Sequence, residues 1–267
     1  MTSDLRTRAA AAAVASALVA LGTAACGNGS SGPEFLTSDP PTAAITLPSG
    51  TAIAVTPFLN QITAAMVASG SAEVVLRSAA ESAAGRFTTM GARTDFDISV
   101  TVPASGFSNL EMKIVNGVSY VAVPGSTAAG KFFVLPPGNT SIGGLLTSLT
   151  AIQPGSTLLK LAPAVRSIVD LGAATIGSDL TEHYVLLIDT AKSNTALSTG
   201  VSPPSSVTSK LPKTIRYNLY ITKDNLVRRV HISVLGKPLT VDYTHWGSAA
   251  QISAPSHADL IAAPAGF

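Results

Sequence analysis

Histidines and closely spaced acids are the residues of this chain whose types could support metal or acid–base chemistry. The four histidines do not stand at metal-ligand spacing from one another: His183, His231, His245 and His257. His231 and His245 fall in expected strands, where a solvated or hydrogen-bonded imidazole is the better interpretation. Asp95 and Asp97 lie two residues apart and share the polar face of a strand, so they predict a solvated edge rather than a catalytic pair. No metal site is expected.

Motifs of common hydrolases and of phosphate-binding loops are missing from the sequence. No Gly-x-Ser-x-Gly or Ser-x-x-Lys pattern follows residue 26. Gly143-Gly144 opens an expected helix but lacks the lysine that a phosphate-binding loop requires. The sequence therefore predicts neither an enzyme nor a cofactor.

Cys26 is the single cysteine, so it cannot form a disulfide within the chain. It follows a charged segment, residues 1–8, and an uncharged run of Ala, Leu and Val, residues 9–25, which is the layout of a signal peptide. Thr23-Ala24-Ala25-Cys26 resembles a lipobox, with Thr23 where leucine is usual. In a lipobox the thiol receives a diacylglyceryl group. The alternative is ordinary signal cleavage with Cys26 incidental.

Composition divides the remaining chain. Residues 26–55 are rich in Gly, Ser, Thr and Pro and predict a flexible linker. Residues 56–255 suffice for a single domain, followed by a tail over residues 256–267. Without residues 1–25 the chain has 15 basic and 14 acidic residues, so no nucleic-acid partner is expected. Only 12% of residues are charged against 46% hydrophobic, an apolar balance for a water-soluble domain.

Hydrophobic periodicity predicts a helix over residues 56–69, capped by Thr56 and stopped at Gly70. Strands are expected over residues 72–80, 85–102, 110–115, 118–123 and 131–135. Asn116-Gly117 predicts a two-residue hairpin turn. Apolar runs at 142–152 and 156–171 are interpreted as weakly charged helices, with Pro163 kinking or shortening the second.

Strands return at residues 182–187, followed by a Ser/Pro/Thr-rich excursion over 193–209. Three alternating segments, residues 215–222, 226–235 and 239–243, predict a C-terminal meander. The expected fold class is α+β, a strongly curved antiparallel sheet with helices on one face.

Three segments of the meander are similar to the mycobacterial LppX/LprA/LprF/LprG lipoprotein family: LPKTIRY at 211–217, DNLVRRV at 224–230 and VDYTHWG at 241–247. The resemblance implies a LolA/LolB-like half-barrel whose open face is covered by helices around an apolar cavity. It further implies a lipoprotein anchored to the outer face of the cell membrane, which binds acylated lipid or lipoglycan and helps to move it across the envelope. An envelope lipid transporter is then a candidate partner.

Apolar residues of the middle helices and of the sheet are the expected cavity lining. They are Ile142, Leu145, Leu146, Leu149, Leu158, Leu161, Val165, Ile168, Val100, Met112 and Tyr217. The alternative is that they pack a solid core. A scaffold or sensor acting through protein contacts is the rival function, which an exterior apolar patch would mark. An envelope hydrolase ranks third.

Overall fold

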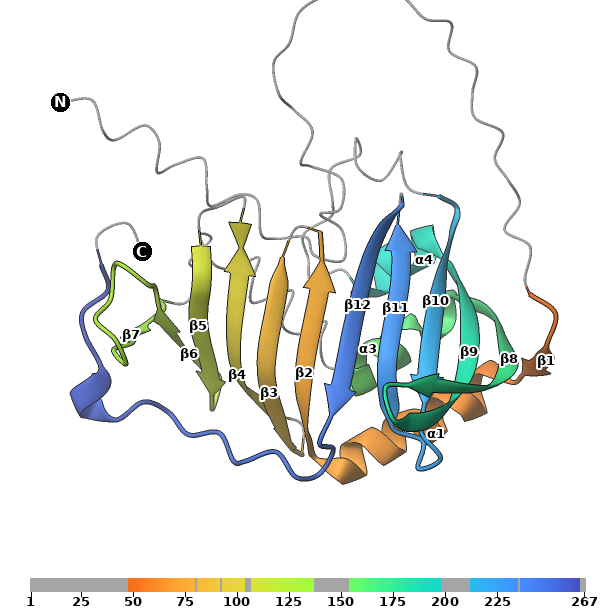
Figure 1. Cartoon of the computed structure of the whole chain (residues 1–267), viewed down its shortest axis with the longest axis horizontal. Coiled ribbons are helices and arrows are strands. Elements are labelled where there is room, and N and C mark those ends of the chain that lie inside the picture. The colour runs from red at the N-terminus through yellow and green to blue at the C-terminus, as the bar shows by residue number, and fades with distance from the viewer. Residues whose placement is uncertain are drawn as a thin grey trace, which may run out of the picture.

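A single antiparallel sheet dominates the molecule (Figure 1). The computed structural model describes residues 48–79, 81–91, 93–103, 107–136, 154–197, 212–234 and 236–264. Within them, twelve strands follow the order β1-β8-β9-β10-β11-β12-β2-β3-β4-β5-β6-β7. Every neighbouring pair is antiparallel, so the predicted antiparallel sheet is confirmed. The sheet is open, with β1 and β7 at its two ends.

The strands are β1 (Thr51–Ile53), β2 (Ser71–Ser78), β3 (Ser82–Met90), β4 (Arg93–Val102), β5 (Phe107–Val115), β6 (Val118–Ala122), β7 (Phe133–Val134), β8 (Val165–Ile176), β9 (Asp179–Asp189), β10 (Thr214–Ile221), β11 (Val227–Val234) and β12 (Lys237–Thr244). Over the described ranges the α-helices are α1 (Val55–Ser69), α3 (Pro154–Leu161) and α4 (Thr190–Leu197), and the short 3₁₀ turns are η3 (Ala162–Ala164) and η4 (His257–Asp259).

The turn predicted at Asn116-Gly117 is present, whereas a turn at Gly91 was not predicted. Asn116 and Gly117 both adopt positive φ, 55° and 78°, between β5 and β6, which confirms the hairpin. The single strand expected over residues 85–102 is instead two strands, β3 and β4, which pair with each other. Gly91, at φ 62°, lies in the turn between them. The alternation of apolar and polar residues holds over residues 95–102, within β4, and so did not indicate that the chain reverses before it.

The helix expected over residues 156–171 is wrong beyond Leu161. There α3 ends and η3 follows, with Pro163 in its first turn. Proline has no N–H to continue a helical ladder. The residues after η3 include the β-branched Val165, Ile168 and Val169, which suit an extended strand, and β8 pairs with β9 along most of its length. The helix expected over residues 142–152 lies outside the described residues.

Helix α1 begins at Val55 and ends at Ser69, within one residue of the prediction. Gly70 ends it in the left-handed conformation and donates its N–H to the Met66 carbonyl, as expected. Thr56 is not the cap: Ala54 occupies that position and provides no side-chain hydrogen bond. The helix is instead held by its buried face of Leu59, Ile62 and Met66.

The predicted meander is confirmed as β10, β11 and β12, and its place in the sheet is not local. It lies between β9 and β2, so β12 pairs with a strand that is about 160 residues earlier in the chain. The expected Ser/Pro/Thr-rich excursion starts within α4. Through the pairing of β12 with β2, the meander joins the C-terminal and N-terminal halves of the described chain in one sheet.

Both termini of the described chain take part in the sheet region. Residues 51–53, within the expected linker, form β1 and pair with Val169 and its neighbours on β8. At the other end, the Phe132 N–H donates to the Asp259 carbonyl and the Ile261 N–H to the Phe132 carbonyl. Residues 256–264 therefore contact the chain beside β7.

The far end of the β8–β9 hairpin forms an arm, residues 173–181. Gly172, at φ 87°, stands at a register shift in β8, and β9 stops pairing with β10 at Glu182. The arm crosses β10 in Figure 1, and an Arg228–Asp179 ion pair of 2.6 Å ties it to β11. Arg228 is the extra residue of a bulge in β11.

No helix among the described residues is long and apolar enough to cross a membrane.

Candidate functional site

One face of the sheet is lined by apolar cross-strand rows. In the Tyr243 row each residue is the register partner of the next: Tyr243, Val74, Gly85, Ile98, Met112, Val121 and Phe133. The Tyr217 row runs in the same way through Ile53, Ile168, Leu186, Tyr217, Ile232 and Leu239. Because side chains alternate between the faces of a strand, each row points to one face. We call this face the inner face.

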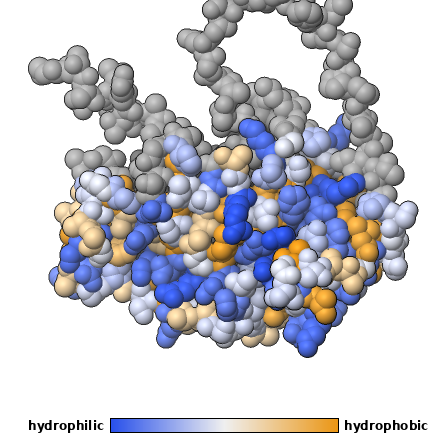
Figure 2. Space-filling view, in the orientation of Figure 1, coloured by the Kyte–Doolittle hydropathy of each residue, from blue (hydrophilic) through white to orange (hydrophobic). Residues whose placement is uncertain are grey.

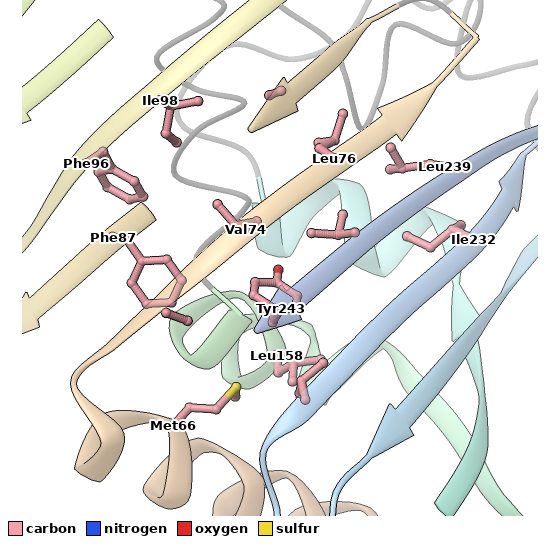
Figure 3. Close-up of a cluster of buried hydrophobic side chains, with 14 of the residues drawn as sticks. Met66, Val74, Leu76, Phe87, Phe96, Ile98, Leu158, Ile232, Leu239 and Tyr243 are labelled. Carbon is pink, nitrogen blue, oxygen red and sulfur yellow. The ribbon is translucent and has the colours of Figure 1, made fainter. Parts of the chain in front are cut away.

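Helices α1 and α3 pack against the inner face. Leu59, Met66, Leu158 and Leu161 belong to the same buried cluster as the sheet residues. Figure 3 shows Met66 and Leu158 directed toward Tyr243 and the neighbouring strands. The apolar interior, defined here as this buried cluster between inner face and helices, is the candidate site.

Six of the predicted cavity residues meet in the apolar interior. They come from five elements: Leu158, Leu161, Ile168, Val100, Met112 and Tyr217. Val165 is half-buried and packs against the same cluster, from β8 rather than from a helix. Ile142, Leu145, Leu146, Leu149 and the predicted anchor Cys26 lie outside the described residues. The fold thus brings together all the predicted lining residues that it describes.

An aromatic group at the sheet's centre was missed by the sequence reasoning. The Phe87 ring lies 5.8 Å from Trp246 and 6.3 Å from Phe96, and Tyr243 stacks on Trp246 at 5.7 Å. The Trp246 indole N–H donates to the Val227 carbonyl at 2.9 Å. Phe96 stood in the predicted alternation. Trp246, after the last strand, carried no signal in its spacing that linked it to Phe87.

Small residues occupy the inner face of β3 between bulkier strands. Ala83 stands between Leu76 and Val100, and Gly85 between Val74 and Ile98. A Cβ on Gly85 would lie 2.6 Å from the Ile98 Cα and still closer to the Asp97 carbonyl, so only glycine suits this approach of β3 to β4. The inner face of β3 is therefore low at Ala83 and Gly85 and rises again at Phe87.

The opposite, outer face carries the charged residues of the same strands. One outer row alternates in sign: Glu73, Arg86, Asp97 and Lys113 are successive register partners on β2 to β5. Arg86 and Lys113 approach the Asp97 carboxylate to 2.9 and 3.5 Å. Figure 2 shows this helix-free side with hydrophilic residues across the centre of the sheet. Opposite charges facing each other across strands stabilise the sheet.

Asp242 is the centre of a second outer cluster. Its carboxylate lies 2.6 Å from Arg229, 2.9 Å from Arg77 and 3.5 Å from Arg228. Burial alone would raise the pKa of Asp242, but the hydrogen bond and charge of Arg229, with the other arginines, lower it below its ordinary value. Asp242 is therefore ionised at neutral pH and holds β2, β11 and β12 together from outside.

The two buried phenols of the inner face stay neutral. Burial raises the pKa of Tyr217 to about 12 and also raises the pKa of Tyr243. Both side chains belong to the apolar interior. Each can therefore offer a hydroxyl proton, and neither brings a charge into the interior at neutral pH.

The four histidines lie on separate segments: β9, β11, the residue after β12 and η4. The His231 ring contacts the Thr240 hydroxyl at 3.0 Å and the His245 ring contacts Glu73 at 2.9 Å, which confirms hydrogen-bonded imidazoles. His183 contacts Asn218 and stacks on Tyr220. Within the described ranges, no three His, Cys, Asp or Glu residues form a metal-binding group.

The predicted solvated edge at Asp95 and Asp97 is wrong for Asp95. That side chain is buried, with only 1% of the residue exposed, and its carboxylate accepts the Asn116 N–H at 3.0 Å. Arg93 lies 3.2 Å away and balances its charge. Asp95 thus stabilises the β5–β6 turn, which only tertiary structure brings next to it.

Comparisons with solved structures identify the architecture. LprF from Mycobacterium bovis matches with a TM-score of 0.53 at 15% sequence identity, over 76% of this chain and 97% of LprF. LppX from Mycobacterium tuberculosis, described as a lipoprotein, matches with a TM-score of 0.51 at 14% identity, over 74% of this chain and 98% of LppX. The chain has the LprF and LppX fold.

This result confirms, at the level of the fold, the resemblance noted in residues 211–247. No protein-family model matches the chain, and no curated protein matches its sequence. The likeness therefore lies in the arrangement of strands and helices and not in extended sequence identity.

Proposed function

We propose that this protein binds the acyl chains of a lipid or glycolipid in its apolar interior and helps to transport it across the cell envelope, without catalysis. In this proposal the sheet acts as a half-barrel whose open face is covered by helices. The observation that supports it most is the inner face, where two cross-strand rows spanning the sheet contain no charged side chain.

The cost of exposing acyl chains to water explains why such a carrier is needed. Each buried methylene is worth about 0.8 kcal/mol, so one long acyl chain exposed to water costs on the order of 10 kcal/mol. A lipid with two or three chains crosses an aqueous gap only when a host encloses those chains. An interior of Leu, Ile, Val and Phe side chains needs no reactive group for this task.

The membrane anchor is the second part of the proposal. Lipidation at Cys26 would keep the carrier at the outer face of the membrane, next to its cargo and to an envelope lipid transporter as partner. Replacing Cys26 with serine should remove the diacylglyceryl mass from the exported protein and release it from the membrane fraction. Intact-mass spectrometry of both fractions checks this. A Cys26→Ser protein that still sediments with membranes would contradict the anchor and leave the lipid site untouched.

Organic extraction of the purified protein, followed by mass spectrometry, tests the cargo directly. Co-purifying acyl lipid is expected. Protein that is repeatedly empty, and that takes up no lipid from vesicles, would favour the scaffold or sensor instead. The exposed Val118 and Val134, near each other at the β6–β7 end of the sheet, would then be the first surface to examine.

Filling the interior distinguishes a lipid cavity from a solid core. The sequence-based choice is tryptophan at Leu146 and Val165. The structure adds a matched pair on β3, Ala83→Leu and Ala84→Leu, since Ala83 faces the inner side and Ala84 is exposed on the outer side.

The two substitutions of the pair add the same three carbons at neighbouring positions. If lipid occupies the interior, Ala83→Leu reduces bound lipid with little change in stability, while Ala84→Leu changes neither. If the interior is solidly packed, Ala83→Leu overpacks it and lowers the free energy of unfolding by about 1–3 kcal/mol. Chemical denaturation and lipid stoichiometry, measured together, separate the two.

A further inference from the structure

We infer that the outer face of the sheet has a docking groove for a protein partner, which binds there through an extended segment with two basic residues and a small apolar residue between them. The groove crosses β2, β3, β4 and β5, on the helix-free side of the sheet that Figure 2 views. The inference goes beyond the proposed function and does not depend on lipid binding in the apolar interior.

Small side chains form the floor of the groove. Val75, Ala84 and Ser99 are successive register partners on β2, β3 and β4, and they alternate with the buried residues of the inner face. Longer side chains of the next outer row, including Arg86 and Asp97, form a wall beside this floor. The hollow has a volume of about 470 Å³, within the range of roughly 300–1,000 Å³ that is typical of ligand sites. It can therefore receive the side chains of a short peptide segment.

Two exposed acids at opposite ends of the groove lack a lysine or arginine partner. Among the described residues, no basic side chain forms an ion pair with Glu111 on β5. Glu73 on β2 pairs with the His245 ring at 2.9 Å, and an imidazole is charged only when it is protonated. Arg86 is already paired with Asp97 at 2.9 Å. The groove thus presents two carboxylates that a partner's cations can neutralise.

The separation of the two acids determines the spacing of those cations. Glu73 and Glu111 are three strand spacings of about 4.8 Å apart, with one step of two residues, about 6.6 Å, along the strand, or about 16 Å in all. In an extended segment, residues i and i+4 lie about 13 Å apart and point to the same side, as does residue i+2. Long basic side chains at i and i+4 therefore reach both acids, and a small apolar residue at i+2 meets the floor.

Charge and floor together favour a protein segment over other occupants. The anionic head groups of a membrane surface would be repelled by Glu73 and Glu111. A free polyamine would meet both acids, but it has no side chain to place against Val75 and Ala84. A basic segment with a central apolar residue satisfies both features of the groove.

Titration of the full-length protein with two synthetic peptides, followed by NMR, tests the groove. The probe is Gly-Lys-Ser-Val-Ser-Lys-Gly, and the control peptide Gly-Lys-Val-Lys-Ser-Ser-Gly has the same composition with its lysines only two residues apart. The probe should bind about two- to fivefold more tightly, the worth of one exposed ion pair. Amide shifts should be centred on Ala84 and Ser99, at the floor of the groove.

Substitution of the acids gives the matched comparison. Glu111→Gln should weaken binding of the probe about two- to fivefold. Glu182→Gln removes an exposed acid of β9 that does not line the groove and should leave the affinity unchanged. Glu111→Lys should bind Gly-Lys-Ser-Val-Ser-Glu-Gly more tightly than the probe, which reverses the preference of the wild type.

The other outcomes overturn the inference. Equal binding of the two lysine peptides, or an equal loss of affinity in Glu182→Gln, would show a general attraction between opposite charges. Binding of the probe without amide shifts at Ala84 and Ser99, or no binding at all, would remove the groove as a docking site. Spermidine that binds as tightly as the probe would assign the groove to a polyamine and not to a protein.

Discussion

The inner and outer faces of β4 carry side chains of opposite chemistry, although only one strand separates them. Phe96, Ile98 and Val100 point inward and join the apolar interior, while Asp97 and Ser99 alternate with them and face outward. Asp97 forms ion pairs with Arg86 and Lys113 on the neighbouring strands, and the inward residues meet only other apolar groups in their row. The sheet thus separates charge from hydrocarbon within the thickness of one backbone.

The difference shows which face of the sheet tolerates changes of side chain. Cross-strand pairs on the outer face contribute roughly 0.2–1 kcal/mol each. Burial of each large inner side chain contributes roughly 1.5–3 kcal/mol. The outer face can therefore vary in sequence at low cost, whereas the inner face must stay uncharged both for stability and for contact with acyl chains.

A charge moved from the outer to the inner side should have the largest effect. Ile98→Lys places an ammonium in the Tyr243 row, where the register partners are Gly85 and Met112. Without an acid partner there, the loss of unfolding free energy should be about 3–5 kcal/mol. Urea denaturation followed by circular dichroism measures it.

Ser99→Lys is the control for that substitution, one residue along β4 on the outer face and opposite Glu111. It should change the free energy of unfolding by no more than about 0.5 kcal/mol. Equal effects at residues 98 and 99 would show that the two faces do not differ as described.

Loss of the Asp242 carboxylate should have an intermediate effect. Asp242→Asn leaves Arg77, Arg228 and Arg229 close together without their shared acid. The expected loss is about 1–3 kcal/mol at neutral pH. Because the folded pKa of Asp242 lies below its unfolded value, wild-type stability from this group is complete above the unfolded pKa.

That contribution disappears as the pH falls through the lowered folded pKa, since the unfolded chain then binds more protons. The difference between wild type and Asp242→Asn should therefore shrink between about pH 5 and pH 2. Thermal melts across this range measure it, and a difference that is constant with pH would show that the carboxylate's charge is not the cause.

Release of the hairpin arm should have the smallest effect. Asp179→Asn weakens the ion pair with Arg228, at a cost of no more than about 1 kcal/mol for a pair this exposed. Hydrogen exchange should quicken in residues 173–181, which pair only within the hairpin. Exchange in β10 and β11 should not change, and an effect that spreads into them would show that the arm supports the sheet itself.

Most strands could be predicted from the sequence because alternation is a local property. The alternation in β4 predicts a buried face of Phe96, Ile98, Val100 and Val102 without reference to any other segment. The Asn116-Gly117 turn and the stop at Gly70 follow from backbone preferences of single residues. The apolar run after Leu161 was ambiguous, because Val165, Ile168 and Val169 recur at a spacing that also fits one face of a helix, although they lie in β8.

Contacts between segments far apart in the chain could not be predicted from local sequence patterns. The pairing of β12 with β2, the burial of Asp95 beneath the β5–β6 turn and the contact of Trp246 with Phe87 all join distant segments. Six predicted lining residues are adjacent only because the strand order places β4, β5, β8 and β10 in one sheet with α3 against it.

The sequence alone determined which residues could be buried and where the chain could turn, since hydrophobicity and φ preferences belong to individual residues and their near neighbours. Tertiary structure decided which apolar residues face one another, which acid is buried, and that a single phenol stands in an aliphatic row. Those properties depend on the register between strands far apart in the chain, which is set by the packing of the whole sheet.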